Sequence, residues 1–210
     1  MAKTYTGQDI EISFDMKRCI HARNCFLKLP QVFDPARRPW VSPDAAPAEE
    51  IAAMVRTCPS GALTYRRLDG AAEEVAPGIN RAAVIENGPM ALYGNLRLGD
   101  QEMHRATLCR CGQTKTPPFC DHSHDEAGFT ATGEPAPTGK DAPGEDQGEA
   151  VQVIPHENGP VEVRGALEIT GGSGKRVHRG PRAFLCRCGQ SKNKPFCDGS
   201  HKAAGFEVPG

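Results

Sequence analysis

The chain has 210 residues, of which 38% are hydrophobic, and its 23 glycines and 18 prolines make it rich in turns and poor in core-forming side chains. Its net charge of −1 is spread over interspersed signs, which gives no basic field for nucleic acid or for an anionic membrane. No apolar run approaches membrane-spanning length, and the first residues lack an apolar signal segment, so we expect neither an anchor nor a secretory signal.

Nine cysteines fall into three separate groups of three along the chain. The disulfide framework of a secreted protein more often uses an even number of interleaved cysteines. Together with the missing signal segment, this grouping favours a reducing, cytoplasmic compartment. With so few large apolar side chains, we expect small domains held together by cofactors rather than one large core.

Residues 1–68 are predicted to form the first domain. Apolar and polar residues alternate over Ile10–Phe14, which indicates a half-buried strand. The proline-rich segment 30–43 is predicted to be irregular or to form short strands, and residues 63–65 are predicted to form a closing strand. Between them, Asp44 is predicted to cap a helix with four residues on its buried face: Ile51, Met54, Val55 and Cys58.

This domain contains Cys19, His21 and Cys25 in a C-x-H-x3-C spacing, followed after the helix by Cys58 and a proline. A cysteine before proline, combined with an upstream cysteine group, is typical of the iron ligands of bacterial ferredoxins. The segment resembles the divergent single-cluster ferredoxin family in this spacing, in RRPW at 37–40 and in CPSGAL at 58–63.

The resemblance implies a small α+β domain with one iron-sulfur cluster on Cys19, Cys25 and Cys58. Three cysteines leave a four-iron cubane one ligand short, and Ala22, at the middle position between Cys19 and Cys25, cannot ligate iron. We therefore keep two alternatives, a 3Fe-4S cluster on the three cysteines and a 4Fe-4S cluster completed by His21.

The rest of the chain contains an internal repeat. Small and acidic residues at 69–80 predict a linker, and the first unit follows at 81–130. Residues 131–150 have no large apolar side chain and are predicted to be a flexible linker before the second unit at 151–210. The sequence ENGP recurs at an offset of 71 and the cysteine motif at an offset of 77, so the second unit is expected to have a longer turn after Ile169.

Each unit carries three cysteines and one histidine in a C-x-C-x8-C-x3-H spacing, within CRCGQTKTPPFCDHSH and CRCGQSKNKPFCDGSH. Thiolate and imidazole ligands suit iron-sulfur clusters or zinc. Structural zinc usually takes cysteines separated by two or more residues, whereas one residue separates each first pair here, which argues against zinc. The predicted ligands are Cys109, Cys111, Cys120 and His124, and Cys186, Cys188, Cys197 and His201.

Both motifs resemble the CDGSH, or NEET, iron-sulfur family, whose pattern is C-x-C-x2-[ST]-x3-P-x-C-D-G-[STA]-H. The second copy fits at every position, while the first has His122 where the family has glycine. The resemblance implies a 2Fe-2S cluster in each copy, with Cys109 and Cys111, or Cys186 and Cys188, on the inner iron. Because single-motif members pair as homodimers, we predict two mainly antiparallel-β units packed as a pseudo-dimer within an α+β chain.

A short helix is predicted to follow the third cysteine of each motif, capped by Asp121 or Asp198 and ended by Gly128 or Gly205. In such a helix Gly199 would not need a positive φ, so His122 would be tolerated at the matching position. His122 lies close enough in sequence to compete with His124 for iron, and we keep His124 as the ligand.

These sites predict an electron-transfer protein with two 2Fe-2S clusters and a third, 3Fe-4S or 4Fe-4S cluster. The alternatives are a cluster carrier or redox and pH sensor that releases its clusters through the histidine ligand, and a structural zinc protein. No residue set indicates a stand-alone enzyme. The expected partners are a soluble redox protein or reductase, or an apo iron-sulfur protein, with no nucleic acid and no membrane, and we expect a monomer.

Overall fold

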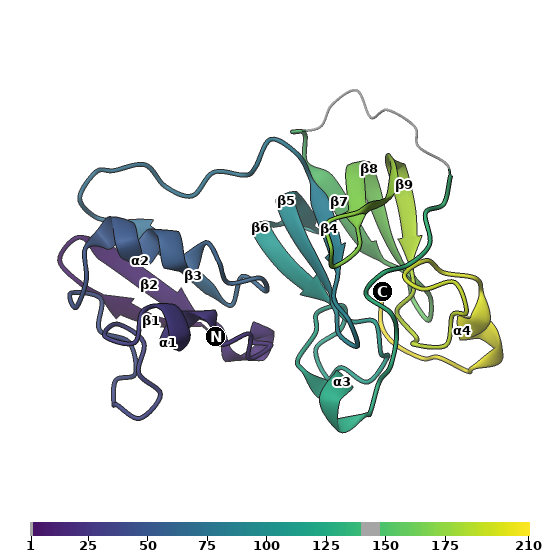
Figure 1. Ribbon diagram of the computed structural model, residues 1–210, viewed down its shortest axis with the longest axis horizontal. Helices are drawn as coiled ribbons and strands as arrows, with labels where there is room; N and C mark the ends of the chain where they lie inside the picture. The colour runs from purple at the N-terminus through teal and green to yellow at the C-terminus, as the bar shows by residue number, and fades with distance from the viewer. Residues whose placement is uncertain (1, 140–147) are drawn as a thin grey trace. The chain divides into compact units, whose positions relative to one another are not determined.

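The structure, a computed structural model, describes residues 2–139 and 148–210, and the chain divides into unit 1, Met1–Val75, and unit 2, Ala76–Gly210 (Figure 1). The boundary falls inside the segment 69–80 that was predicted to be a linker. Asn80, the last residue of that segment, is fully buried in unit 2. Its side-chain amide donates to the carbonyl oxygens of Glu149 and Ala166, at 2.8 and 3.2 Å. The linker is therefore shorter than predicted at its C-terminal end.

Unit 1 is built on a three-stranded antiparallel sheet in the order β1 (Lys3–Thr6), β2 (Ile10–Phe14), β3 (Leu63–Arg67). The 3-10 helix η1 (Met16–Arg18) follows β2, and the helices are α1 (Asn24–Lys28) and α2 (Ala48–Val55). Ile10, Ile12 and Phe14 are buried, which confirms the alternating strand. They share a core with the buried face of α2.

Helix α2 buries Ile51, Met54 and Val55 as predicted, but it begins four residues after the predicted cap. The residue before Pro47 is sterically disfavoured in a helix, so the helix starts only beyond that proline. The carboxylate of Asp44 instead accepts a hydrogen bond from the Gln8 amide at 2.7 Å. Cys58 lies three residues beyond the end of the helix, in the turn that leads to β3.

Unit 2 contains one six-stranded sheet to which each half of the repeat contributes three strands. The first half forms β4 (Arg81–Val84), β5 (Met90–Leu98) and β6 (Gln101–Leu108). The second forms β7 (Val151–Pro155), β8 (Val161–Thr170) and β9 (Arg176–Leu185). Neighbouring strands within each half are antiparallel, as predicted.

The two halves are joined by strand pairing that crosses between them. Strand β4 pairs with β8 and β5 pairs with β7, and both of these pairings are parallel. Buried apolar side chains of both halves form one core, including Leu92 and Leu96 from β5 and Val163 and Leu167 from β8. The short helices α3 (Ser123–Glu126) and α4 (Ser200–Ala203) lie at the same end of this sheet (Figure 1).

Residues 131–138, predicted to be part of a flexible linker, instead make specific hydrogen bonds within unit 2. The Asn87 backbone amide donates to the Ala131 carbonyl at 2.9 Å, and the Asn87 side chain accepts from the Ala131 amide at 3.0 Å. The Thr138 amide donates to the Val177 carbonyl at 2.9 Å. This segment thus extends the first half, and residues 140–147 of the predicted linker lie outside the described residues.

The longer turn predicted after Ile169 is confirmed in part, because residues 171–175 join β8 to β9 whereas only residues 99–100 join β5 to β6. The other additional residues lengthen the strands β8 and β9. None of the helices in residues 2–139 and 148–210 has the length and apolar character of a membrane-spanning segment.

Candidate metal centres

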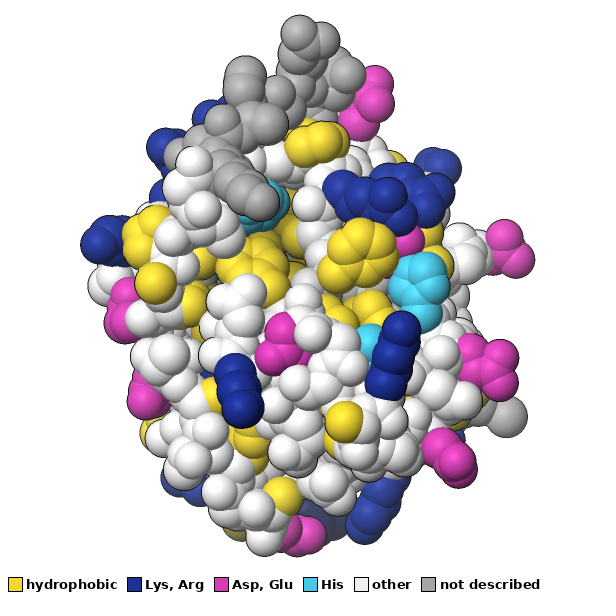
Figure 2. All heavy atoms as spheres, turned by 90° about the vertical axis from the view of Figure 1, so that its right-hand side faces the viewer, with side chains coloured by type: hydrophobic (Ala, Val, Ile, Leu, Met, Phe, Trp, Pro, Cys, Tyr) yellow, Lys and Arg dark blue, Asp and Glu magenta, His cyan; other side chains and the backbone are white. Residues whose placement is uncertain are grey.

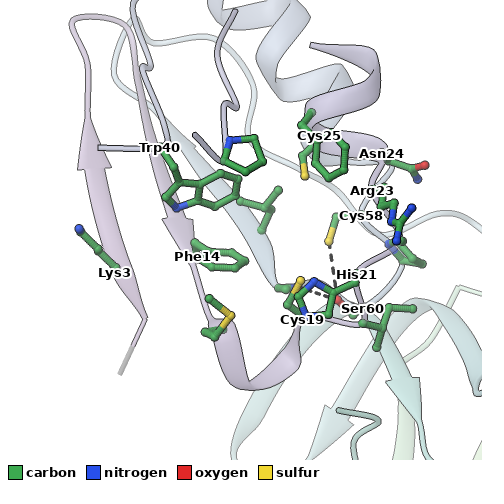
Figure 3. A pocket seen from close by; sticks show the side chains of 18 of the residues that line it. Lys3, Phe14, Cys19, His21, Arg23, Asn24, Cys25, Trp40, Cys58 and Ser60 are labelled. Atoms are coloured by element: carbon green, nitrogen blue, oxygen red, sulfur yellow. Dashed lines mark hydrogen bonds between the residues drawn. The ribbon is translucent and has the colours of Figure 1, made fainter. Parts of the chain in front are cut away.

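Unit 1 brings its three cysteines to one cavity from three different elements. Cys19 follows η1, Cys25 lies on α1, and Cys58 follows α2. The cavity has a volume of about 490 Å³, and the three sulfur atoms point toward one another across it (Figure 3). Cys19 and Cys25 lie 39 and 33 residues before Cys58 in the chain. All three nevertheless line the same cavity, as predicted.

The loop between Cys19 and Cys25 turns sharply to reach this cavity. His21 and Arg23 have φ values of 52° and 64°, in the left-handed region that non-glycine residues rarely adopt. Such backbone strain costs on the order of 1–3 kcal/mol per residue and is concentrated at binding sites. His21 and Ala22 both line the cavity, so the candidate fourth ligand and the residue that cannot ligate lie side by side.

The surroundings of the three thiols suit a negatively charged cluster. Burial raises the pKa of Cys19 and Cys25, so these thiols are protonated at neutral pH unless a metal replaces the proton. Three cationic side chains line the cavity, and its lining contains no carboxylate. The Trp40 indole closes the apolar wall, with its ring centroid 4.8 Å from that of Phe14.

In unit 2 the predicted ligands form an inner and an outer pair in each half. The inner sulfur atoms are 3.5 Å apart for Cys109 and Cys111, and 3.8 Å apart for Cys186 and Cys188. In the outer pairs, the histidine Nδ1 lies 3.4 Å from the cysteine Sγ, both for His124 with Cys120 and for His201 with Cys197. The structure therefore places His124, and not His122, in the position that His201 occupies.

Two polar side chains at equivalent positions, a Thr or Ser and an Asp, hold the ligand loop in each half. Thr114 and Ser191 each donate a hydroxyl hydrogen bond of 2.7 Å, to the carbonyls of Phe119 and Phe196. Asp121 and Asp198 each accept from a lysine amide across the loop at 2.8 Å. These bonds hold the third cysteine near the inner pair, which gives a physical role to the Thr or Ser and the Asp of the motif.

The helices after these loops begin one residue later than predicted, at Ser123 and Ser200. Asp121 and Asp198 still accept from the amides of these serines, at 3.1 and 3.0 Å. Gly128 and Gly205 both have a φ of 59°, which confirms the predicted ends of the helices.

The prediction that Gly199 would not need a positive φ is wrong. Gly199 has a φ of 87° and His122 one of 77°, so this position is left-handed in both halves. His122 is therefore strained where Gly199 is not. Its Nε2 lies 3.0 Å from an Asp125 carboxylate oxygen, and its ring centroid is 4.9 Å from that of His124.

An arginine between the inner cysteines is buried in each half, a feature that the sequence analysis missed. Arg110 is 2% exposed and Arg187 is 1% exposed. Arg110 Nε donates to the Gly88 carbonyl at 2.6 Å, and Arg187 Nε donates to the Gly159 carbonyl at 3.0 Å. The repeated C-R-C sequence could have indicated these buried arginines, because solubility alone does not explain an arginine at the same position in both ligand loops.

These arginines bring positive charge to the ligands of the opposite half. Burial lowers the pKa of Arg110 to about 10 and also lowers that of Arg187, yet both remain charged at neutral pH. Arg110 interacts electrostatically with Cys186, and Arg187 with Cys109. Each half thus supplies a buried cation that opposes the negative charge of thiolates in the other.

Two glycines show how closely the two ligand loops approach each other. A Cβ on Gly112 would lie 2.7 Å from the Cys188 carbonyl oxygen, and one on Gly189 would lie 2.4 Å from that of Cys111. Both glycines also have a positive φ, 80° and 76°. The contact is reciprocal, so the second cysteine of each inner pair lies against the loop of the other half.

The outer ligands are more accessible in the second half than in the first. Cys120 and His124 are 2% and 8% exposed, and burial raises the pKa of the Cys120 thiol to about 12. Cys197 and His201 are only half-buried. Of the two predicted histidine ligands, His201 of the second half is therefore the more exposed.

Comparison with known proteins agrees with these sites. Residues 5–68 match the family model described as divergent 4Fe-4S mono-cluster, and residues 87–125 and 158–202 match the one described as iron-binding zinc finger CDGSH type. The uncharacterized protein YjdI of Escherichia coli, in strains K12 and O157:H7, is 38% identical over 64 residues. That match covers 30% of this chain and 84% of YjdI.

Proposed function

We propose that this chain, which belongs to the divergent 4Fe-4S mono-cluster family through unit 1 and to the CDGSH-type iron-binding family through unit 2, is a multi-cluster electron carrier. In this proposal Cys109, Cys111, Cys120 and His124 hold one 2Fe-2S cluster. The second is held by Cys186, Cys188, Cys197 and His201. Cys19, Cys25 and Cys58 hold the third cluster in unit 1.

The separation of the donor atoms into pairs is the observation that carries this proposal. Four ligands around one tetrahedral zinc would lie about 3.8 Å from one another, given a Zn–S distance of about 2.3 Å. Among the described residues, the group with three donor atoms all within 4.8 Å of one another is His122, His124 and Asp125, and it contains no cysteine. Each quartet thus has an inner and an outer pair whose two donor atoms are close, but the two pairs do not close around one point. This arrangement suits a two-iron cluster better than a single ion.

The pairing of the halves supports an intrachain pseudo-dimer. The parallel β4–β8 and β5–β7 pairings are equivalent under the repeat, and the Gly112 and Gly189 contacts are reciprocal. A symmetric dimer has this kind of interface, in which each copy gives the contact that it receives. The two halves of one chain would then form the paired arrangement that two chains form in single-motif members. We therefore propose that the protein acts as a monomer.

The third cluster is either 3Fe-4S or 4Fe-4S, and His21 is the residue on which the difference depends. The structure places His21 at the cavity, and Ala22 beside it offers no ligand. If His21 ligates a fourth iron, replacing it with alanine converts the EPR signal of the unit 1 cluster to that of a three-iron cluster. If the wild type already shows the three-iron signal, His21 is not a ligand.

We propose electron transfer rather than catalysis because the functional groups of the chain are accounted for by cluster binding. The 490 Å³ cavity of unit 1 is lined by the cysteine triad itself. All nine cysteines are free of disulfides, which suits a reducing, cytoplasmic compartment. The proposed partners are a soluble reductase or another redox protein.

The test is EPR spectroscopy with iron and sulfide analysis on anaerobically purified protein. We expect about seven or eight iron atoms per chain and two reducible 2Fe-2S signals, with reduction that is reversible at neutral pH. A colourless protein with stoichiometric zinc would refute the proposal.

A second candidate function is transfer of a cluster to apo-proteins, and the half-buried His201 and Cys197 favour it. A neutral imidazole is more readily displaced from iron than a thiolate, so an exposed histidine ligand offers a route for release. Transfer of iron to an apo-ferredoxin by the wild type, lost in His201→Cys, would support this function over electron transfer.

A further inference from the structure

The two halves of unit 2 differ in charge although they share their fold and ligands. Residues 151–210 contain nine Lys and Arg and five Asp and Glu, whereas residues 81–130 contain five and six. The second half therefore has a net charge of +4 and the first half one of −1. A difference of this size within one repeat indicates that the two halves meet different surroundings.

The difference is strong beside the ligand histidines. In the first half, Asp125 follows His124, and its carboxylate lies 3.4 Å from the imidazole Nε2. In the second half, the residue after His201 is Lys202, which is exposed. The accessible histidine ligand is thus flanked by a cation, and the buried one by an anion.

A cationic and aromatic surface, here called the Arg-Phe face, lies on β8, β9 and the residue that follows β7 in the second half. It consists of His156, Arg164, Arg182 and Phe184, arranged around the carboxylate of Glu162, which is 1% exposed. That carboxylate pairs with His156 at 2.9 Å, Arg164 at 2.9 Å and Arg182 at 2.7 Å. Burial alone would raise the pKa of Glu162, but the hydrogen bonds from these three side chains lower it to about 2.

The basic groups of the Arg-Phe face are held in place and still face solvent. Arg164 and Arg182 have side chains that are 59% and 53% exposed, although both are bonded to Glu162. Phe184 is 38% exposed, and the Arg182 guanidinium lies 4.6 Å from its ring centroid. Figure 2 shows Lys or Arg and His side chains bordering a hydrophobic side chain on this side of the molecule. Two guanidinium groups around one carboxylate leave the face net positive.

The Arg-Phe face is joined directly to the ligand loop of the second half. The Cys197 amide donates to the Phe184 carbonyl at 2.8 Å. Arg187, between the two inner cysteines, donates to the His156 carbonyl. A protein that covers Phe184 would therefore lie next to the outer ligand pair, Cys197 and His201.

The first half does not reproduce this surface. The strand registers pair Glu162 with Phe184 in the second half, and Ala91 with Thr107 at the equivalent place in the first. Arg164 corresponds to Tyr93 in the same way. Arg182 corresponds to Arg105, which is buried, so exposed arginines and an exposed aromatic ring occur together at this place in only one copy.

We propose that the Arg-Phe face, with Lys202, is the docking surface for an acidic electron-carrier protein, and that electrons enter unit 2 through the cluster of the second half. Carboxylates of the partner pair with Arg164 and Arg182, and its apolar surface covers Phe184. The cluster that Cys186, Cys188, Cys197 and His201 would hold would accept one electron, and the partner would be oxidised by one electron. This inference rests on the proposed electron-transfer function and names the partner of that site.

The test measures reduction of the full chain by a reduced, acidic plant-type ferredoxin in stopped-flow experiments at several ionic strengths. We expect the second-order rate to fall steeply as salt rises, because oppositely charged surfaces steer the encounter. The variant Arg164→Tyr, Arg182→Gln, Phe184→Thr removes two positive charges and the exposed ring from this face, while His156 and the amide introduced at position 182 can still donate to the Glu162 carboxylate. At low salt we expect its rate to be about tenfold lower than that of the wild type.

Two controls separate this proposal from the proposed function. Arg97→Gln removes an exposed arginine from the first half, whose partner is Glu102, and we expect a rate within about twofold of the wild type. Lys202→Gln leaves the Glu162 ion pairs intact and is expected to slow reduction in the same direction as the triple variant. Freeze-quenched EPR, with the second cluster identified through His201→Cys, should show that this cluster is reduced first.

Equal rates for the triple variant and the wild type would overturn the docking proposal. Faster reduction by a reduced flavoprotein of positive net charge than by the acidic ferredoxin would also overturn it. If dithionite still reduces all clusters reversibly in that case, the electron-transfer function stands. Absence of reducible clusters in the wild type would instead refute the proposed function itself.

Discussion

The two halves of unit 2 have nearly the same ligand geometry and very different surroundings. In both, the outer histidine Nδ1 lies 3.4 Å from its cysteine, and the same Asp and Thr or Ser side chains fix the loop. In the first half the histidine is buried beside Asp125 and His122, whereas in the second it is half-buried beside Lys202. The comparison teaches that the motif determines ligand positions, while residues outside it determine access and charge.

Loss of an inner ligand should have the largest effect and should affect the halves separately. Cys111→Ser or Cys188→Ser removes a thiolate that a neutral hydroxyl does not replace, so each variant should lose about two irons. Iron and sulfide analysis with EPR measures this loss. If either substitution removes both clusters, the two sites depend on each other for assembly and the halves are not independent.

Replacing a buried arginine should lower both stability and reduction potential. Arg110→Met or Arg187→Met removes the buried arginine donor of the Gly88 or the Gly159 carbonyl, at a cost of about 3 kcal/mol in the free energy of unfolding. It also removes a positive charge that favours the reduced, more negative cluster, so the potential should fall. Arg→Lys at the same positions keeps the charge but not the forked hydrogen bonds.

Denaturant unfolding and spectroelectrochemistry distinguish these two roles. We expect the lysine variants to retain most of the potential and to lose stability. An unchanged potential in both methionine variants would mean that Arg110 and Arg187 act only as structural hydrogen-bond donors.

Adding a methyl group at the contact between the ligand loops should destabilise both halves. Gly112→Ala and Gly189→Ala place a Cβ within 2.7 and 2.4 Å of a carbonyl oxygen and also force alanine into a positive φ. We expect a loss of about 2–4 kcal/mol. Gly174→Ala is the control, because Gly174 has a φ of 83° but nothing within 4 Å of the added Cβ.

The control should cost about 1 kcal/mol, from backbone strain alone. Thermal unfolding monitored by the visible absorption of the clusters measures the three variants together. Equal losses at all three positions would show that the loops have room to move apart.

The smallest effect concerns the position at which the two motifs differ. His122→Gly should raise the free energy of unfolding by about 1 kcal/mol, because it relieves a left-handed backbone, and Gly199→His should lower it by a similar amount. The absorption spectrum of the first cluster should not change. A changed spectrum in His122→Gly would mean that His122, rather than His124, binds iron.

Several features followed from local sequence alone. Alternation over Ile10–Phe14 predicted β2, and the apolar spacing of Ile51, Met54 and Val55 predicted the buried face of α2. The glycines at 128 and 205 predicted the ends of α3 and α4. These signals are reliable because strand alternation, helix periodicity and a left-handed glycine each depend on a few neighbouring residues.

Other predictions failed where distant residues decided the outcome. Asp44 looked like a helix cap, but its carboxylate binds the Gln8 amide, 36 residues away. Residues 131–138 have the composition of a linker, yet Asn87 and Val177 fix them through backbone hydrogen bonds. Composition shows that a segment lacks core-forming side chains, but it does not show which of its backbone groups form hydrogen bonds with distant residues.

The sequence by itself determined the ligand types, their spacing and the repeat, because a C-x-C-x8-C-x3-H loop can bring its four donors together over a short length of chain. Only the tertiary structure decided that Arg110 lies near Cys186 and Arg187 near Cys109, and that Glu162 pairs with two arginines beside Phe184. Those relations join residues far apart in the chain, and they depend on strand pairing and register, which no local pattern encodes.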